Sequence, residues 1–247
     1  SSDGTTVRST SVNFYEQWTD TGDGIRDPNE LALVRAESAA ASVDVLRLSS
    51  SFRSKKTNVT SLGNSDIGAD ALDRQSRTYF AGTLPGDEIA DYTYSYKSDG
   101  FSVRSTSYNF YEHNSQRVRA KDANPSDVLK VTTSYKGDKT LSDTDLEDSM
   151  TQGRQSKTFF YTGLGQGDEI ADYTYNYASD GNTVKTVSVN LYVSTQTPKY
   201  ASEVLATDKA ILVRSDSFRA SSFADTNVTS NRRSSTYFYG VEAGDEI

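Results

Sequence analysis

Aromatic and polar residues alternate with a period of two along several stretches of the chain. Residues 92–96 place a tyrosine at every second position, with Thr and Ser between, and residues 173–177 repeat this arrangement. Successive side chains of a β-strand point to opposite faces of a sheet, so the alternation predicts strands with one aromatic and one hydroxylated face. A Ser-Asp-Gly turn follows at residues 98–100 and 179–181, since Asp and Gly tolerate the left-handed angles of tight turns. We expect an antiparallel hairpin at each turn.

The alternating pattern belongs to a longer repeat. The tetrapeptide Gly-Asp-Glu-Ile ends at residues 89, 170 and 247, which gives spacings of 81 and 77 residues. A fixed period of this kind indicates a repeat architecture. We therefore predict three units, at residues 1–89, 90–170 and 171–247. The first carries an insertion at residues 16–42 and lacks its first strand.

Each unit is expected to hold four main strands. In the second unit these cover residues 90–96, 101–111, 128–136 and 154–160. The fold class predicted is all-β, a tandem repeat of about 80-residue four-stranded antiparallel units stacked as an elongated array. Segments of similar sequence predict a fifth, edge strand in each unit, and they lie at residues 33–36, 117–120 and 198–201.

Two local features break the pattern. Val213 and Arg214 exchange polarity relative to the corresponding residues of the first two units, which predicts a bulge or register change. The Ala-rich segment at residues 29–41 is the one place where we expect a turn or two of helix.

The printed sequence begins just after the position of a first strand and ends just before another. We expect the strand edges at this junction to be completed by a neighbouring copy or by continuous chain, because an unpaired edge offers free backbone hydrogen-bonding groups. The residues assigned to this assembly edge are Val7, Val12, Phe14, Tyr237, Tyr239 and Ile247.

The composition of the chain excludes several classes of partner and several kinds of chemistry. Only 34% of the residues are hydrophobic, but 16 Tyr and 10 Phe supply large rings, so a thin aromatic core is expected. A net charge of −8 argues against nucleic acid and anionic membranes as partners. No apolar run approaches the roughly 20 residues that span a bilayer, and the absence of Cys excludes disulfides and thiolate chemistry.

No catalytic constellation is predicted. Paired carboxylates could act as acid and base, but the pairs at residues 87–88, 168–169 and 245–246 recur in every unit, which favours a structural turn. His113, the sole histidine, is replaced by Gln17 and Ser194 at equivalent positions. No Gly-x-Ser-x-Gly elbow is present. We predict that the protein is not an enzyme.

The insertion holds a candidate calcium loop. Asp23, Asp27 and Glu30 fall at offsets 5, 9 and 12 of an acidic calcium loop, and Ile25 is placed to offer its carbonyl at offset 7. The loop resembles the aspartate-rich loops of thrombospondin type-3 and related secreted calcium modules. A solvated acidic turn is the alternative, because Thr19 and Thr21 occupy the first acidic positions. Calcium is the one cofactor that the sequence suggests.

Two features of the sequence are compatible with glycans. Asn58 and Asn227 begin Asn-Val-Thr sequons in equivalent loops, which makes them candidate glycosylation sites, and a polar loop without glycan is the alternative. The tyrosine faces could also stack against sugars, as in carbohydrate-binding modules. Cross-strand packing of the same rings is the other interpretation.

The Tyr-x-Tyr-x-x-Asp-Gly pattern at residues 94–100 and 175–181 resembles the tyrosine-and-aspartate (YD, or Rhs-type) repeats of large secreted and cell-surface bacterial proteins. The unit of about 80 residues is also similar to the tandem repeats of very large bacterial surface proteins. This resemblance implies β-sheet built by repetition, an extracellular or cell-surface location, and a structural or encapsulating role.

Two functional hypotheses follow. The first is a structural repeat protein that forms an extracellular filament, stalk or surface layer by head-to-tail strand continuation, with copies of itself or further chain as partner. The second is an adhesin or carbohydrate-binding module on a repeat stalk, with its specificity in residues 16–42.

Overall fold

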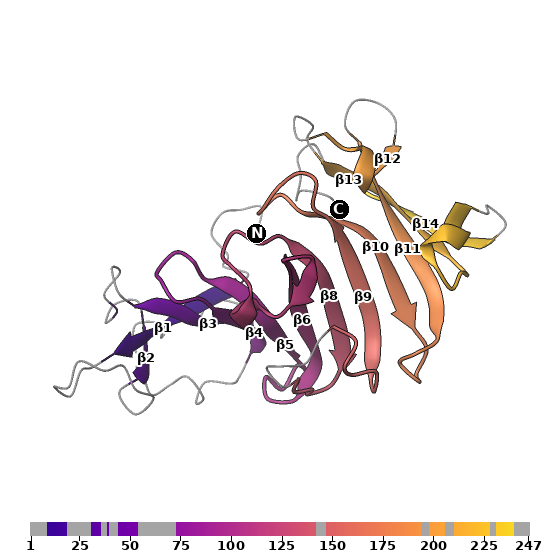
Figure 1. The fold of residues 1–247 in the computed structure, drawn as a ribbon. Coiled ribbons are helices and arrows are strands. Elements are labelled where there is room, and N and C mark those ends of the chain that lie inside the picture. The colour runs from indigo at the N-terminus through magenta and orange to yellow at the C-terminus, as the bar shows by residue number, and fades with distance from the viewer. Residues whose placement is uncertain are drawn as a thin grey trace. The chain divides into compact units, whose positions relative to one another are not determined.

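The computed structural model describes residues 9–18, 31–35, 39, 44–53, 73–141, 147–193, 198–205, 210–227 and 231–239. These residues form fourteen β-strands and three short 3₁₀ helices, without an α-helix among them (Figure 1). The all-β prediction is confirmed. No helix in this part of the chain is long and apolar enough to cross a membrane.

The strands are β1 (Ser9–Trp18), β2 (Leu31–Arg35), β3 (Val45–Arg53), β4 (Arg74–Ala81), β5 (Ile89–Tyr96), β6 (Val103–His113), β7 (Gln116–Val118), β8 (Leu129–Lys136), β9 (Arg154–Tyr161), β10 (Ile170–Tyr177), β11 (Val184–Val193), β12 (Pro198–Tyr200), β13 (Ile211–Phe218) and β14 (Arg232–Tyr237). The 3₁₀ helices are η4 (Ala120–Asp122), η5 (Ala201–Glu203) and η6 (Phe223–Asn227). Hydrogen bonding follows the strand order β14-β13-β11-β10-β9-β8-β6-β5-β4-β3-β1-β2, with β12 beside β11 and β7 beside β6.

The contacts within the structure divide the chain into two compact units, which differ from the three predicted repeats. From here on, the first and the second unit are these two compact parts. The first comprises residues 1–107 with 137–139, and the second comprises residues 108–136 with 140–247. Strand β6 supplies residues to both, because the division falls between Ser107 and Tyr108. The division of the sequence into three repeats remains a prediction.

The hairpin predicted around residues 179–181 is present. β10 and β11 pair antiparallel, with Tyr175 opposite Val187. In the turn between them Gly181 has a φ of 70°, a left-handed angle that favours glycine. The side chain of Asp180 accepts hydrogen bonds from the backbone nitrogens of Asn182 and Thr183, both at 2.9 Å. Gly181 therefore has the left-handed angle that the sequence predicted, whereas Asp180 acts through its side chain and not through a left-handed backbone angle.

The short fifth strands are also present, as β2, β7 and β12, which pair with β1, β6 and β11. The helix expected at residues 29–41 is wrong for the residues that form β2, and the rest of that segment is described only at Ala39. Helix propensity is a weak preference. Here Val34 is 3% exposed and lies opposite Tyr15, so burial and strand pairing override it.

The register change predicted at residues 213–214 is present, but it is not special to the third predicted repeat. Leu191 lies opposite Arg214 and the next residue opposite Leu212, so β13 carries one extra residue. β3 carries an extra residue at the equivalent place, where Phe14 lies opposite Leu48 and the next residue opposite Leu46. A bulge at this point of the strand is thus a shared feature.

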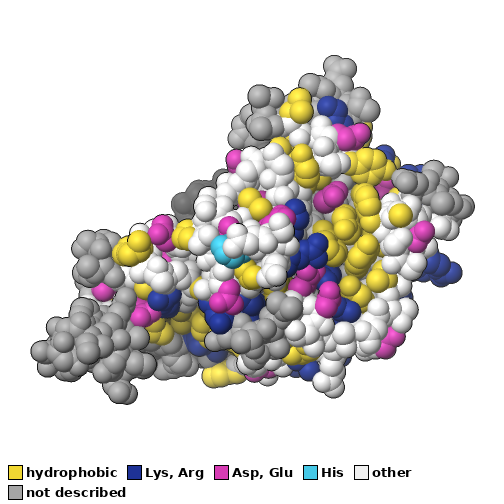
Figure 2. Space-filling model, viewed as in Figure 1, with side chains coloured by type: hydrophobic (Ala, Val, Ile, Leu, Met, Phe, Trp, Pro, Cys, Tyr) yellow, Lys and Arg dark blue, Asp and Glu magenta, His cyan; other side chains and the backbone are white. Residues whose placement is uncertain are grey.

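One face of the strands in the second unit carries the core. Val187, Val189 and Phe218 form a buried cluster against which Tyr173 and Tyr175 pack. Figure 2 shows hydrophobic side chains gathered over β9 and β10. In the first unit the equivalent core is built from Val12, Phe14, Leu48 and Phe52, with Tyr79 packed against it.

The opposite face carries hydroxyl groups, and we call it the Ser/Thr face. Directly opposed residues form one row across β8, β9, β10, β11, β13 and β14, and none of them is buried. The row consists of Thr132, Thr158, Thr174, Ser188, Ser217 and Ser234. Within the row the hydroxyls of Thr158 and Thr174 are 2.9 Å apart, so they share a hydrogen bond.

Candidate functional site

The glutamates of the repeated carboxylate pairs hold the backbone in place. Glu169 accepts hydrogen bonds from the backbone nitrogens of Leu129, at 3.0 Å, and Gly167, at 2.9 Å. Glu88 does the same for Leu46, at 2.7 Å, and Gly86, at 2.8 Å. Each glutamate therefore links a turn to the start of a strand about 40 residues earlier. These contacts agree with the structural role predicted for the pairs, while residues 245–246 lie outside the described part.

A buried arginine lies against the last tyrosine of β5 and of β10. Arg74 donates two hydrogen bonds to the carbonyl oxygen of Gly100, at 3.1 and 2.9 Å, and its guanidinium lies 4.3 Å from the centre of the Tyr96 ring. A guanidinium over an aromatic face is attracted by the ring quadrupole. The sequence interpretation missed this role. The available signal was a charged residue at a core-facing position of a strand.

The predicted calcium and glycosylation residues fall mainly outside the described residues. This applies to Asp23, Ile25, Asp27, Glu30 and Asn58. Of Asn227 only the backbone is described, as the last residue of η6. Among the residues that the structure describes, no three carboxylate or imidazole side chains gather in a way that could hold a metal ion. Calcium and glycans remain predictions.

His113 takes part in a polar contact at the end of β6. Its Nδ1 lies 2.8 Å from Oδ2 of Asp127, and the amide nitrogen of Asn114 lies 2.9 Å from its Nε2. The same Asp127 oxygen accepts a hydrogen bond of 2.6 Å from the backbone nitrogen of Asn124. The imidazole thus joins the β6–β7 turn to the loop before β8.

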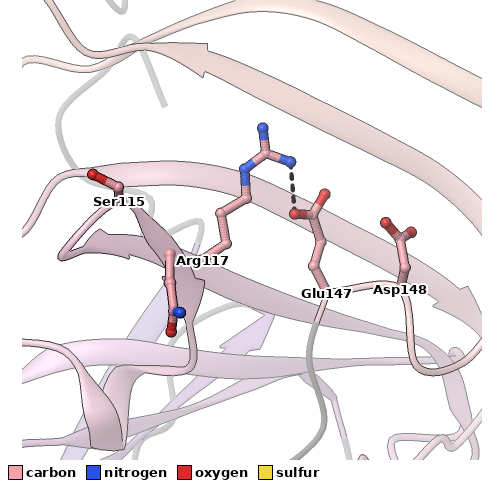
Figure 3. Close-up of a pocket in the computed structure, with 5 residues that line it drawn as sticks. Ser115, Arg117, Glu147 and Asp148 are labelled. Atoms are coloured by element: carbon pink, nitrogen blue, oxygen red, sulfur yellow. Dashed lines mark hydrogen bonds and ion pairs between the residues drawn. The ribbon is translucent and has the colours of Figure 1, made fainter.

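A charged pocket of about 580 Å³ lies beside β7 in the second unit (Figure 3). Its lining residues are Ser115, Gln116, Arg117, Glu147 and Asp148. Arg117 extends toward Glu147 and donates a 2.7 Å hydrogen bond to its carboxylate. The sequence interpretation did not find this pocket.

Buried cations surround the acidic side of the pocket. Lys157 pairs with both Glu147 and Asp148, and Arg154 donates a 2.8 Å hydrogen bond to Asp148. Burial raises the pKa of the Asp148 carboxyl, but Lys157 and Arg154 outweigh this effect and hold the pKa below its ordinary value. Arg117 also lies over the Phe159 ring, at 5.4 Å from its centre.

The aromatic rows of the sheet are stacked on one another. The rings of Phe159 and Tyr173 lie 4.6 Å apart and nearly parallel, and Phe223 also stacks on Tyr173, at 4.6 Å. Burial, together with Tyr175 and Asp172, raises the pKa of Tyr173 to about 12. The Tyr173 ring is therefore used for packing against two phenylalanines within the protein. This arrangement favours the cross-strand packing interpretation over sugar stacking at this ring.

The outer edge of β14 differs from the edges of the equivalent strands β4 and β9. β4 pairs with β3 and β5, and β9 pairs with β8 and β10. Within the described residues β14 pairs with β13 alone. Tyr237, which lies in β14, is 72% exposed, and Tyr239, just after it, is 84% exposed.

The other residues predicted for the assembly edge have different positions. Val7 and Ile247 lie outside the described residues. Val12 and Phe14 are each 3% exposed, and their side chains belong to the core of the first unit. Phe14 also pairs on both sides, with Arg35 of β2 and Leu48 of β3, so it does not lie at a free strand edge. The outer edge of β14 is therefore the candidate site that the described residues support best.

Comparisons of the chain with protein-family models, with curated proteins and with solved structures gave no match.

Proposed function

We propose that this chain is a structural element of an extracellular filament, stalk or surface layer, and that the assembly grows by continuation of its β-structure from strand to strand. The observation that carries the proposal is the outer edge of β14, where the ring of Tyr237 is 72% exposed and no second strand is present among the described residues. An edge strand offers a row of backbone donors and acceptors to another chain.

Repeated contacts support a role that depends on repetition. The pairs Leu46 with Glu88 and Leu129 with Glu169 are equivalent, as are the contacts of Arg74 and Arg154 with their glycine carbonyls. Each of these contacts lies within one of the two compact units. Each holds the backbone in place and is not arranged as a set of catalytic groups. Strand addition at an edge is a heterologous contact that does not close on itself, so it propagates as a fibre.

Negative-stain imaging of concentrated protein tests the proposal. Long uniform fibres are the expected result, and a monodisperse monomer at high concentration would contradict it. Ser235→Pro, in the middle of β14, should shorten or abolish the fibres, because proline has no N–H and breaks the ladder.

The matched control for this variant is Ser98→Pro. Ser98 is exposed and is the second residue of the turn between β5 and β6, in which the backbone nitrogen of Gly100 donates to the carbonyl oxygen of Lys97. The second position of a β-turn accepts proline. This variant should therefore leave the fibres unchanged.

Glycan binding is the second candidate function. The observation that favours it is the charged pocket of about 580 Å³, which is within the size range of ligand sites and offers both donors and acceptors. A glycan array probed with the wild-type chain and with Arg117→Gln tests this role. Retention of the wild type that the variant loses would support glycan binding, and no retention on any glycan would oppose it.

A further inference from the structure

We propose that the outer edge of β14 accepts a strand of one particular pattern, Tyr-Thr-Tyr-x-Tyr, in a fixed register. This inference rests on the proposed function, since it assumes that β14 is extended by strand addition, and it adds which strand fits and why. The pattern places a tyrosine opposite Tyr237, a threonine opposite Thr236 and a final tyrosine beneath Arg232. Residues 92–96 and 173–177 of this chain have that pattern.

Strand β4 shows what covers such an edge in the first unit. β5 lies along it with Tyr92 opposite Tyr79, and the two rings stack at 4.4 Å with an angle of 14° between their planes. One residue further, the hydroxyls of Thr78 and Thr93 share a hydrogen bond of 3.0 Å. The strand ends at Tyr96, over whose ring the guanidinium of Arg74 lies, as described above.

Strand β9 repeats these three contacts in the second unit. β10 places Tyr173 opposite Phe159, and these rings stack at 4.6 Å. The Thr158 and Thr174 hydroxyls share the 2.9 Å hydrogen bond of the Ser/Thr face. Arg154 lies over the ring of Tyr177, 4.2 Å from its centre. The same recognition pattern therefore serves two separate pairs of strands.

β14 carries the same arginine, threonine and aromatic positions that β4 uses to contact β5. Arg232 lies opposite Phe218, as Arg74 lies opposite Phe52. Counting along the strand from that arginine, Thr236 corresponds to Thr78 and Tyr237 to Tyr79. Arg232, Thr236 and Tyr237 are all exposed, whereas Thr78 and Tyr79 are half-buried beside β5. An added strand of the same type would cover these side chains as β5 covers β4.

Side chains, rather than the backbone ladder alone, give this edge its selectivity. Backbone hydrogen bonds form with any strand, while alternate side chains give specificity in strand addition. Cross-strand aromatic pairs and Thr–Thr hydrogen bonds stabilise a sheet where they lie directly opposite each other. A shift of the added strand by one residue would turn all of its tyrosines to the Ser/Thr face. The register is therefore part of the recognition.

The local charge around β14 also fits a neutral partner strand. Asp216 is 3% exposed and pairs with Arg214 at 3.2 Å and with Arg232 at 3.6 Å. The acidic group is thus already compensated by two arginines. A tyrosine facing this pair adds a ring and a hydroxyl without adding charge, which matches the tyrosines of β5 and β10 at the corresponding positions.

The test uses the full chain and a fluorescently labelled peptide of residues 89–97, with binding followed by fluorescence polarisation. A peptide of the same composition in scrambled order is the control. We expect saturable binding of the first peptide and binding at least about tenfold weaker for the scrambled one, the effect of losing one to two favourable cross-strand pairs. Protein concentrations are kept below those at which fibres form.

Variants of the chain locate the binding. Tyr237→Ala and Thr236→Val should each weaken the peptide by about three- to tenfold, and Arg232→Gln should weaken it by a similar factor. Phe101→Ala, which removes another exposed aromatic side chain, should leave binding unchanged. These side chains are exposed, so the variants are expected to fold, and circular dichroism checks that they do.

The outcomes separate this inference from the proposed function. If scrambled and native peptides bind equally and the β14 variants bind like the wild type, strand addition survives and the recognition pattern is wrong. If no peptide binds and concentrated protein stays monomeric, the proposed function fails as well. Increased protection of the β14 amides from hydrogen exchange, produced by the native peptide alone, would support both.

Discussion

Arg154 spans from β9 to the turn after β10, where its Nε donates a 2.8 Å hydrogen bond to the carbonyl oxygen of Gly181. The arginine side chain is 7% exposed, and its guanidinium also covers the ring of Tyr177. This single side chain therefore joins the start of one strand to the turn that follows the next. The buried guanidinium of Arg154 thereby helps to hold the backbone of this turn in place.

Replacement of this arginine should destabilise the second unit. Arg154→Met keeps the length of the side chain but leaves the Gly181 carbonyl without its donor and removes the contact with Asp148. We expect a loss of about 2–3 kcal/mol in the free energy of unfolding, as for hydrogen bonds to charged groups. Urea unfolding measures it. The exposed Arg104, changed to methionine in the same way, should stay within about 0.5 kcal/mol of the wild type.

The two carboxylates of a repeated pair should respond differently to substitution. Glu169→Ala removes the acceptor for the backbone nitrogens of Leu129 and Gly167, and we expect a cost of about 1–3 kcal/mol. The adjacent Asp168→Ala is the control, and it should cost less than about 0.5 kcal/mol because Asp168 is exposed. Equal losses for the two variants in thermal or urea unfolding would contradict the assigned role of the glutamate.

Gly181 should tolerate no side chain. A Cβ there would lie 1.9 Å from the carbonyl oxygen of Thr151, in addition to the strain of a φ of 70°. Gly165 also has a positive φ, 108°, but a Cβ there would meet nothing within 4 Å. We expect Gly165→Ala to cost about 1 kcal/mol from strain alone and Gly181→Ala to cost at least about 2 kcal/mol more. Urea unfolding of the two variants gives the comparison.

Stability should fall at alkaline pH because of buried phenols. Burial raises the pKa of Tyr135 from 10.0 to about 12. Between these values the unfolded chain has lost a proton that the folded chain retains, so the contribution of Tyr135 is complete below pH 10 and disappears as the pH rises through about 12. Urea unfolding at a series of pH values measures this slope. Tyr135→Phe should reduce it, and an unchanged slope would count against the assignment.

Local periodicity predicted much of the fold. The alternation of tyrosine with Thr and Asn at residues 173–177, and the Asp-Gly turn after it, depend on neighbouring residues alone, and the structure has a strand and a turn there. The segment that became β2 shows where local rules stop. The alanines of residues 29–41 favour helix, but the pairing of β2 with β1 and the packing of Leu33 against the first core are tertiary effects that no short window contains.

The sites depended even more on distant residues. Asp-Glu pairs are visible in the sequence, but the partner of Glu169 lies 40 residues away, at Leu129. The charged pocket joins Arg117 to Glu147, 30 residues apart, and no motif marks either residue. The β14 edge was predictable because it follows from comparing equivalent strands. Pair contacts that depend on how strands meet were beyond sequence reasoning.

The Ser/Thr face has a consequence for the thickness of any assembly. Sheets that stack into amyloid do so through dry, interlocking side-chain faces. A row such as Thr132, Thr158 and Thr174 presents polar hydroxyl groups, so a second sheet stacked on it would have to bury polar groups at a cost. Under the proposed function, growth would then be restricted to the strand edges. A fibre of this protein would remain a single layer, with lateral bundling suppressed by the chemistry of its own surface.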